Sequence, residues 1–142
     1  MLKIRSADLT DYDEILDLYR CFRPKFVPIS ELKSYLDKYP SAVVYKNNAL
    51  VGFAYCYLFS PDILELANIY IAPNNRGEGV GSSVLGYIEK EIKQSDYKGL
   101  ILSNSDLYEA KENKKNAESF YIKNKYKEIA STQNTRVYFK LL

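Results

Sequence analysis

The sequence predicts a mixed α/β fold of the α+β kind, with a single domain over residues 1–142. Three observations predict it. Strand-like and helix-like stretches alternate along the chain, a hairpin signal stands at Asn47-Asn48, and glycines at residues 77–81 join an apolar stretch to an amphipathic one. A hydrophobic content of 46% in 142 residues is sufficient for one folded core.

The N-terminal part is expected to hold one strand, over residues 2–6, and two helices. The first helix spans Leu9–Cys21 and carries one apolar face, formed by Ile15, Leu18, Tyr19 and Phe22. The second helix spans Glu31–Lys38, with Ser30 as its N-cap.

Three strands follow. Residues 42–46 and 50–59 form a hairpin around Asn47-Asn48, because asparagine tolerates the positive φ angles of a two-residue turn. The turn Ser60-Pro61-Asp62 then leads into the apolar strand Ile63–Ile71.

The C-terminal half is expected to fold as helix, strand, helix, strand, strand. Its first helix, Ser82–Gln94, has a core-facing stripe at Val84, Leu85, Ile88 and Ile92. The later elements are a strand at Gly99–Ser103, a helix at Asn113–Asn124 with Ala117, Phe120 and Tyr121 inward, and strands at Tyr126–Ala130 and Arg136–Leu141.

Composition excludes several classes of function. A net charge of +2 with interspersed signs argues against nucleic acid as the main partner, and no apolar run reaches the ~20 residues of a membrane span. With no signal peptide visible, a cytoplasmic location is expected. The sequence has no histidine, which excludes Ser-His and Cys-His catalysis and argues against a metal site. Without a histidine partner, Cys21 and Cys56 are expected to be buried structural thiols. The sequence leaves the oligomeric state open between a monomer and a homodimer.

Glycines between a strand and a helix leave backbone N–H groups pointing to one spot where the helix dipole is positive, which suits a phosphate. The dinucleotide fingerprint G-x-G-x-x-G fails, since the sixth position from Gly77 is Ser82. A Walker A loop fails as well, because no lysine occurs from Pro73 to Glu89.

The stretch Arg76-Gly77-Glu78-Gly79-Val80-Gly81 resembles the pyrophosphate loop [Q/R]-x-x-G-x-[G/A] of the GNAT superfamily of acyl-CoA-dependent N-acetyltransferases. In that family a strand ending in an aliphatic-x-Pro run precedes the loop and a helix follows, as Ile69–Pro73 and Ser82–Leu85 do here. A second block, Ala117–Tyr126, resembles the family's A-x-x-[L/F]-Y-x-x-x-G-F. It departs from the family pattern at three positions. Lys125 stands where the family has glycine, Tyr126 stands where it has phenylalanine, and Lys114 stands where it often has an asparagine.

The resemblance implies a mainly antiparallel central sheet of about six to seven strands, flanked by about four helices, with a splayed strand pair forming the slot for acetyl-CoA. Acetyl-CoA is then the co-substrate, and no metal is needed. The residues implied to bind it are Ile69, Tyr70, Ile71, Arg76, Gly77, Glu78, Gly79, Val80, Gly81, Ser82 and Asn116. Asn113 is the alternative to Asn116 for contact with the pantetheine arm.

Two residues are implied to be catalytic. Tyr121 matches the family tyrosine that assists departure of the coenzyme A thiolate, against the alternative of an ordinary core ring. Glu65 is the candidate base for the attacking amine, because it is the only charged residue between Asp62 and Arg76; the alternative is an outward edge charge. Glu65 and Asn68 should face opposite sides of the strand unless a β-bulge intervenes.

The function hypothesis is direct transfer of an acetyl group from acetyl-CoA to a primary amine, without a covalent enzyme intermediate. The alternative is a non-catalytic coenzyme A-binding sensor or interaction module. The acceptor, a small molecule or a peptide amine, stays open. Residues that would line its site, or simply pack in the core, are Arg23, Phe26, Tyr55, Tyr57 and Tyr138.

Overall fold

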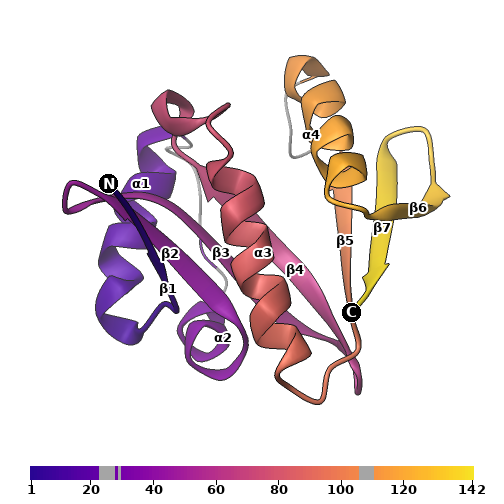
Figure 1. Ribbon diagram of the computed structural model, residues 1–142, viewed down its shortest axis with the longest axis horizontal. Coiled ribbons are helices and arrows are strands. Elements are labelled where there is room, and N and C mark those ends of the chain that lie inside the picture. Colours follow the sequence, from indigo (N-terminus) through magenta and orange to yellow (C-terminus); the bar gives the residue numbers. More distant parts are fainter. Residues whose placement is uncertain (23–27, 29, 106–110) are drawn as a thin grey trace.

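The computed structural model describes residues 1–22, 28, 30–105 and 111–142 (Figure 1). Its described strands form one seven-stranded sheet in the order β1-β2-β3-β4-β5-β7-β6, and β4 and β5 are the parallel pair within it. The strands are β1 (Leu2–Arg5), β2 (Ser41–Lys46), β3 (Ala49–Ser60), β4 (Ile63–Ile71), β5 (Gly99–Ser105), β6 (Lys127–Ser131) and β7 (Thr135–Leu141). The predicted α+β class and mainly antiparallel sheet are confirmed.

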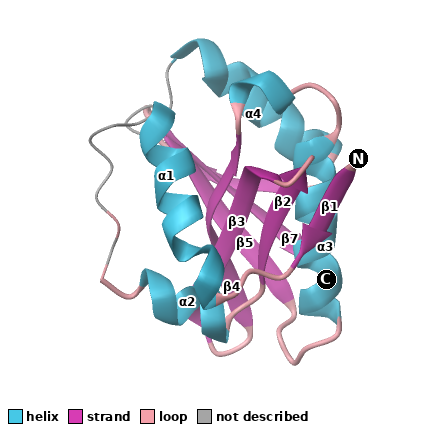
Figure 2. Cartoon of the chain, turned by 90° about the vertical axis from the view of Figure 1, so that its left-hand side faces the viewer, coloured by secondary structure: helices cyan, strands magenta, loops and turns pink. Residues whose placement is uncertain are grey.

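Helices cover both faces of the sheet. They are α1 (Tyr12–Phe22), α2 (Leu32–Lys38), α3 (Val80–Lys93) and α4 (Lys111–Lys123), with short 3-10 turns at Leu9–Asp11 and Pro73–Asn75. Figure 2 shows α1 and α2 on one side of the sheet and α3 on the other. Along the described ranges, no helix combines the length and the apolar character needed to cross a bilayer. The cytoplasmic location stays a prediction.

Each face of the sheet carries its own buried cluster. On the α3 face, the predicted stripe of α3 is confirmed, since all four of its members are fully buried: Val84, Leu85, Ile88 and Ile92. Tyr121 of α4 belongs to the same cluster. On the α1/α2 face, Ile15 and Tyr19 of α1 pack with Leu32 and Leu36 of α2. The sheet therefore separates two cores, and a side chain's face decides which helices it meets.

Local turn signals were confirmed in one place and wrong in another. Asn47 and Asn48 have φ values of 52° and 67°, as the hairpin required. Ser30 is not the N-cap of α2, because the helix begins one residue later with Glu31 at the cap position and no side-chain cap hydrogen bond. The expectation of two buried thiols holds for Cys56 only, since Cys21 is exposed at the end of α1.

The parallel pair separates early. Strands β4 and β5 are in register only where Ile63–Glu65 meets Gly99–Ile101. Beyond that point the two ribbons diverge, and β5 continues alongside β7 (Figure 1). The predicted splayed strand pair is confirmed. Over residues 66–71, the edge of β4 that faces β5 has no strand partner among the described residues.

The end of α4 explains the lysine that stands at the family's glycine position. Lys125 has φ of 73°, its N–H donates to Ile122 O (3.0 Å), and the N–H of Tyr126 donates to Tyr121 O (2.9 Å). This pair of bonds is a Schellman motif, which needs a left-handed residue at the position of Lys125. The turn of the family motif is therefore kept without its glycine.

We expect Lys125→Gly to stabilise the protein by about 1 kcal/mol, because glycine adopts a left-handed conformation without the Cβ penalty. Thermal unfolding should show a melting temperature about 3 °C higher. The matched control is Lys123→Gly in the last turn of α4, where glycine should instead cost about 1 kcal/mol. Equal shifts for the two variants would contradict this account of the turn.

Candidate active site

The loop between β4 and α3 has a backbone that favours glycine at two positions. Gly77 and Gly79 have φ values of 80° and 79°, and Gly79 is the N-cap of α3. A Cβ atom at either position would meet nothing within 4 Å, so the space in front of the loop is open. The glycines therefore set a left-handed backbone rather than relieve a steric clash.

The amides of this loop have no acceptor among the described residues. No backbone hydrogen bond outside the helices and strands comes from the N–H groups of residues 77–79, and those of residues 80–82 belong to the first turn of α3, which has no intrahelical acceptor for them. The first bond of the helix runs from Ser83 N to Gly79 O at 3.1 Å. These N–H groups lie at the positive end of the α3 dipole. A row of free amides at a helix start is an anion-binding arrangement.

Charged side chains beside the loop already have partners. The Arg76 Nε donates to Ile71 O at 2.7 Å, and its guanidinium lies 5.3 Å from the centre of the Tyr70 ring. The exposed Glu78 pairs with Lys46 of β2 at 3.8 Å. Arg76 thus ties the loop to the end of β4. The Ile71 carbonyl oxygen already accepts this hydrogen bond, and it would accept any hydrogen bond from a ligand in addition.

Helix α4 packs directly on the first turn of α3. A Cβ on Gly81 would lie 3.1 Å from the Phe120 ring, and the Asn124 Nδ2 donates to Ser82 Oγ (3.2 Å) and to Phe120 O (2.8 Å). The loop and the helix that carries Tyr121 are therefore one packed unit. The small residue at position 81 is what allows this close approach.

Tyr121 sits in a cluster of rings. Its side chain is 9% exposed, and its ring centre lies 5.1 Å from that of Phe120, 5.3 Å from Tyr138 and 6.1 Å from Tyr126. The Tyr126 hydroxyl donates to Glu89 Oε2 at 2.8 Å, and burial beside that carboxylate raises the pKa of Tyr126 well above its usual value. The hydroxyl that replaces the family's phenylalanine is thus satisfied by α3.

A β-bulge in β4 brings Glu65 and Asn68 to one face. Asn68 lies opposite Tyr55 of β3 and Leu66 lies opposite Cys56, so Ala67 is an extra residue in β4. Glu65 lies opposite Tyr57. Because directly opposed residues share a face and Tyr55 belongs to the α1/α2 core, both polar side chains of β4 are on the α1/α2 face.

Glu65 is partly buried and accepts a hydrogen bond from the neighbouring strand β3. The Tyr57 hydroxyl donates to Glu65 Oε2 at 3.0 Å, and the Tyr35 ring of α2 lies edge-on to the Tyr57 ring at 5.3 Å. Burial, with the neighbouring carboxylate as the second cause, raises the pKa of Tyr57 to about 12. Glu65 is therefore a carboxylate held in place on the sheet, not a free edge charge.

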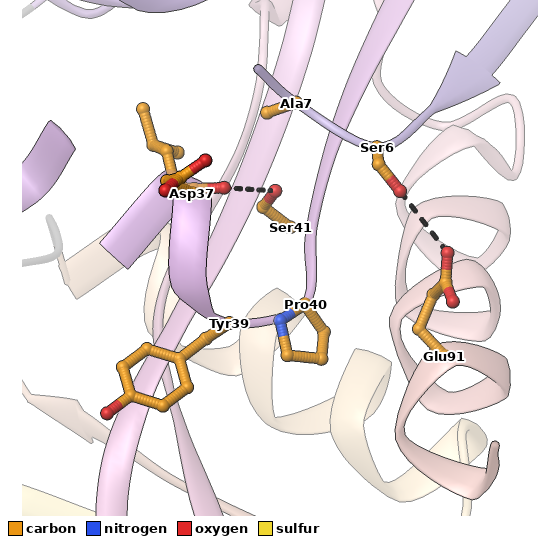
Figure 3. A pocket seen from close by; sticks show the side chains of 8 residues that line it. Ser6, Ala7, Asp37, Tyr39, Pro40, Ser41 and Glu91 are labelled. Atoms are coloured by element: carbon orange, nitrogen blue, oxygen red, sulfur yellow. Dashed lines mark hydrogen bonds between the residues drawn. The ribbon is translucent and has the colours of Figure 1, made fainter. Parts of the chain in front are cut away.

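A cavity of about 230 Å³ lies away from this region (Figure 3). It is lined by side chains from the end of β1, the end of α2, the start of β2 and the C-terminal half of α3, including Asp37, Ser41 and Glu91. Two of the lining residues are joined, since Ser6 Oγ donates to Glu91 Oε1 at 3.2 Å (Figure 3). The glycine loop is at the opposite end of α3, so this cavity is not the predicted slot.

The sequence profile of the acetyltransferase (GNAT) domain matches residues 37–128. The chain belongs to the GNAT acetyltransferases. Its fold is similar to that of the PaiA N-acetyltransferase from Thermoplasma acidophilum in complex with coenzyme A, with a TM-score of 0.74 and 16% identity over 100% of this chain and 99% of that one. It is also similar to the ribosomal-protein-alanine N-acetyltransferase from Brucella melitensis, with a TM-score of 0.78 and 19% identity over 99% of both chains. A third similar structure is the ribosomal-protein-S18-alanine N-acetyltransferase from Escherichia coli, with a TM-score of 0.76 and 19% identity over 99% of this chain and 94% of that one.

In this GNAT protein the predicted site residues fall into two groups. The loop residues 76–82 and Tyr121 are joined through α4 on the α3 face, where Tyr138 is also buried. Glu65 and Asn68 are on the α1/α2 face. Arg23 and Phe26 lie outside the described residues, and so do the side chains of Asn113, Lys114 and Asn116.

The sequence interpretation of this GNAT chain missed three contacts of the site. They are the bond from Tyr57 to Glu65, the pair of Lys46 with Glu78, and the bond from Asn124 to Ser82 of α3. Tyr57 and Glu65 are each about four residues from the centre of the turn at Ser60-Pro61-Asp62, so hairpin register alone could have paired them. The other two contacts join elements far apart in sequence and have no local signal.

Proposed function

We propose that this GNAT protein transfers an acetyl group from acetyl-CoA directly to a primary amine. The observation that carries the proposal is the row of unpaired amides over residues 77–82 at the start of α3, next to a sheet that splays after Glu65. The loop amides would hold the diphosphate of the substrate. The free edge of β4 at Ile69, Tyr70 and Ile71 would bind the pantetheine amides as an added strand does.

The splay lets the two proposed catalytic residues act from opposite faces. Glu65 approaches from the α1/α2 face and Tyr121 from the α3 face. A substrate amine with a pKa of ~10.4 is almost wholly protonated at neutral pH and must lose a proton before it attacks. Glu65, directly or through water, accepts that proton, and the amine nitrogen then bonds to the acetyl carbon.

Tyr121 acts on the leaving group in this proposal. As the C–S bond breaks, its electron pair goes to the sulfur, and the phenol stabilises the thiolate by a hydrogen bond. Complete proton transfer from a phenol of pKa ~10 to a thiolate of pKa ~8.5 is uphill by about 2 kcal/mol, so hydrogen bonding comes first. Protonation of the released thiolate follows.

Direct transfer is supported by the state of Cys56. This thiol is fully buried in the core of the α3 face, and burial raises its pKa to about 12, so it is a poor nucleophile. Ping-pong kinetics or an acetylated cysteine would contradict a direct mechanism.

The test of the proposal is release of free coenzyme A thiol from acetyl-CoA in the presence of single amines. The panel contains polyamines, amino acids, aminoglycosides and peptide amines, so that a positive result also separates small-molecule from peptide acceptors. We expect turnover with one class of amine. Binding of coenzyme A without turnover on any amine would instead support the alternative of a non-catalytic binding module.

Tyr121→Phe is expected to lower kcat by about 10²-fold and to leave the affinity for coenzyme A unchanged, because the hydrogen bond to the developing thiolate is lost while the ring stays in place. Thiol release measures kcat, and calorimetry measures affinity. The matched control is Tyr97→Phe, a partly exposed tyrosine whose ring contacts Tyr39, which should keep full activity. Full activity of a folded Tyr121→Phe would remove Tyr121 from the mechanism.

A further inference from the structure

The carboxylate of Glu65 is oriented from the neighbouring strand. Tyr57 of β3 is its direct cross-strand partner, and the Tyr57 hydroxyl donates to Oε2 at 3.0 Å. Among the described residues, Oε1 accepts no hydrogen bond. One oxygen is thus fixed and the other has no described hydrogen-bond partner, which is the arrangement a base with a defined direction of attack requires.

Tyr57 is itself held in place. Its ring packs edge-on against Tyr35 of α2, with the ring centres 5.3 Å apart. Burial raises the pKa of Tyr57 to about 12, so the phenol keeps its proton and remains a donor throughout the neutral range.

Among the residues that the structure describes, few ionisable groups lie next to Glu65. From β3 it faces Tyr57, with Tyr55 one step along the same face; α2 contributes Tyr35 behind Tyr57; and β5 presents Ile101 opposite. On β4 itself the polar neighbour on this face is Asn68. In the part of the chain that the structure describes, no lysine or arginine pairs with Glu65, so the Tyr57 hydroxyl is the side-chain group that holds its carboxylate there.

We propose that Tyr57 is a positioning residue for acetyl transfer, which orients the carboxylate of Glu65 toward the substrate amine. This inference rests on the proposed function, in which Glu65 takes the proton of the amine. Loss of the phenol hydroxyl removes the donor that fixes Oε2, so the carboxylate is in the productive orientation for a smaller part of the time. The chemical step then slows while binding of the amine is unchanged.

The experiment measures kcat and KM for thiol release with one active amine in the wild type, Tyr57→Phe and Tyr35→Phe. We expect Tyr57→Phe to lower kcat by about 3- to 10-fold and to leave KM for the amine unchanged, because the carboxylate is no longer oriented. Tyr35→Phe keeps the ring contact and has no described bond to Glu65, so its kcat should equal that of the wild type.

A second substitution protects the test against misfolding. Site-specific 3-fluorotyrosine at position 57 keeps the shape of the side chain and its hydroxyl donor, so kcat should stay at the wild-type level. Wild-type kcat in Tyr57→Phe, equal losses in Tyr57→Phe and Tyr35→Phe, or an equal loss in the 3-fluorotyrosine variant overturns the inference while the proposed function stands. Absence of turnover in the wild type overturns the proposed function and the inference with it.

Discussion

Glu65→Gln is expected to lower kcat for acetyl transfer by about 10²- to 10⁴-fold, the usual contribution of a general base. Glutamine has nearly the same shape, and its amide oxygen still accepts a hydrogen bond from the Tyr57 hydroxyl, so the sheet is undisturbed. The lost property is proton acceptance from the amine. Thiol release with one active amine measures the effect.

The affinity for coenzyme A should be unchanged in Glu65→Gln, because the phosphate loop begins eleven residues later and belongs to another part of the site. A matched control is Glu91→Gln, which removes a carboxylate from the far half of α3 and should keep full activity. A folded Glu65→Gln enzyme with wild-type kcat would show that another group, or water alone, accepts the proton.

Gly79→Val is expected to weaken coenzyme A binding by about 10- to 100-fold. Valine disfavours the left-handed backbone at the N-cap of α3, and its side chain enters the open space in front of the loop amides. Loss of one or two hydrogen bonds to a charged diphosphate accounts for this magnitude. Isothermal titration calorimetry with coenzyme A measures it.

The control for this substitution lies in the same helix. Gly86 is exposed in the middle of α3, and a Cβ atom added there would meet nothing within 4 Å. Gly86→Ala should therefore leave binding unchanged and raise the stability of the helix by about 1 kcal/mol. Gly79→Val with wild-type affinity and a normal melting curve would mean that the loop amides do not hold the ligand.

Much of the fold follows from local signals in the sequence. The strand Ile63–Ile71 has the bounds that its apolar run and flanking turn predict, and the buried stripe of α3 follows from helical spacing. Helix ends were less predictable. Helix α3 begins at Val80, two residues before the predicted Ser82, because Gly79 in a left-handed conformation supplies the cap without a side chain.

The candidate site was predictable where it is contiguous in sequence and unpredictable where it depends on strand register. The loop at residues 76–82 is one local motif with its strand and helix on either side. The shared face of Glu65 and Asn68 depends on an extra residue at Ala67, and only pairing with β3 shows where a bulge falls. The role of Lys125 likewise became clear from its φ angle and not from its side chain.

The most direct test of the central claim follows the backbone amides of residues 77–82 by ¹⁵N NMR during titration with coenzyme A and, separately, with pantetheine, which lacks the diphosphate. We predict large shifts of these amide signals with coenzyme A and none with pantetheine. Saturation of the protein with coenzyme A while these six signals stay in place would contradict the account.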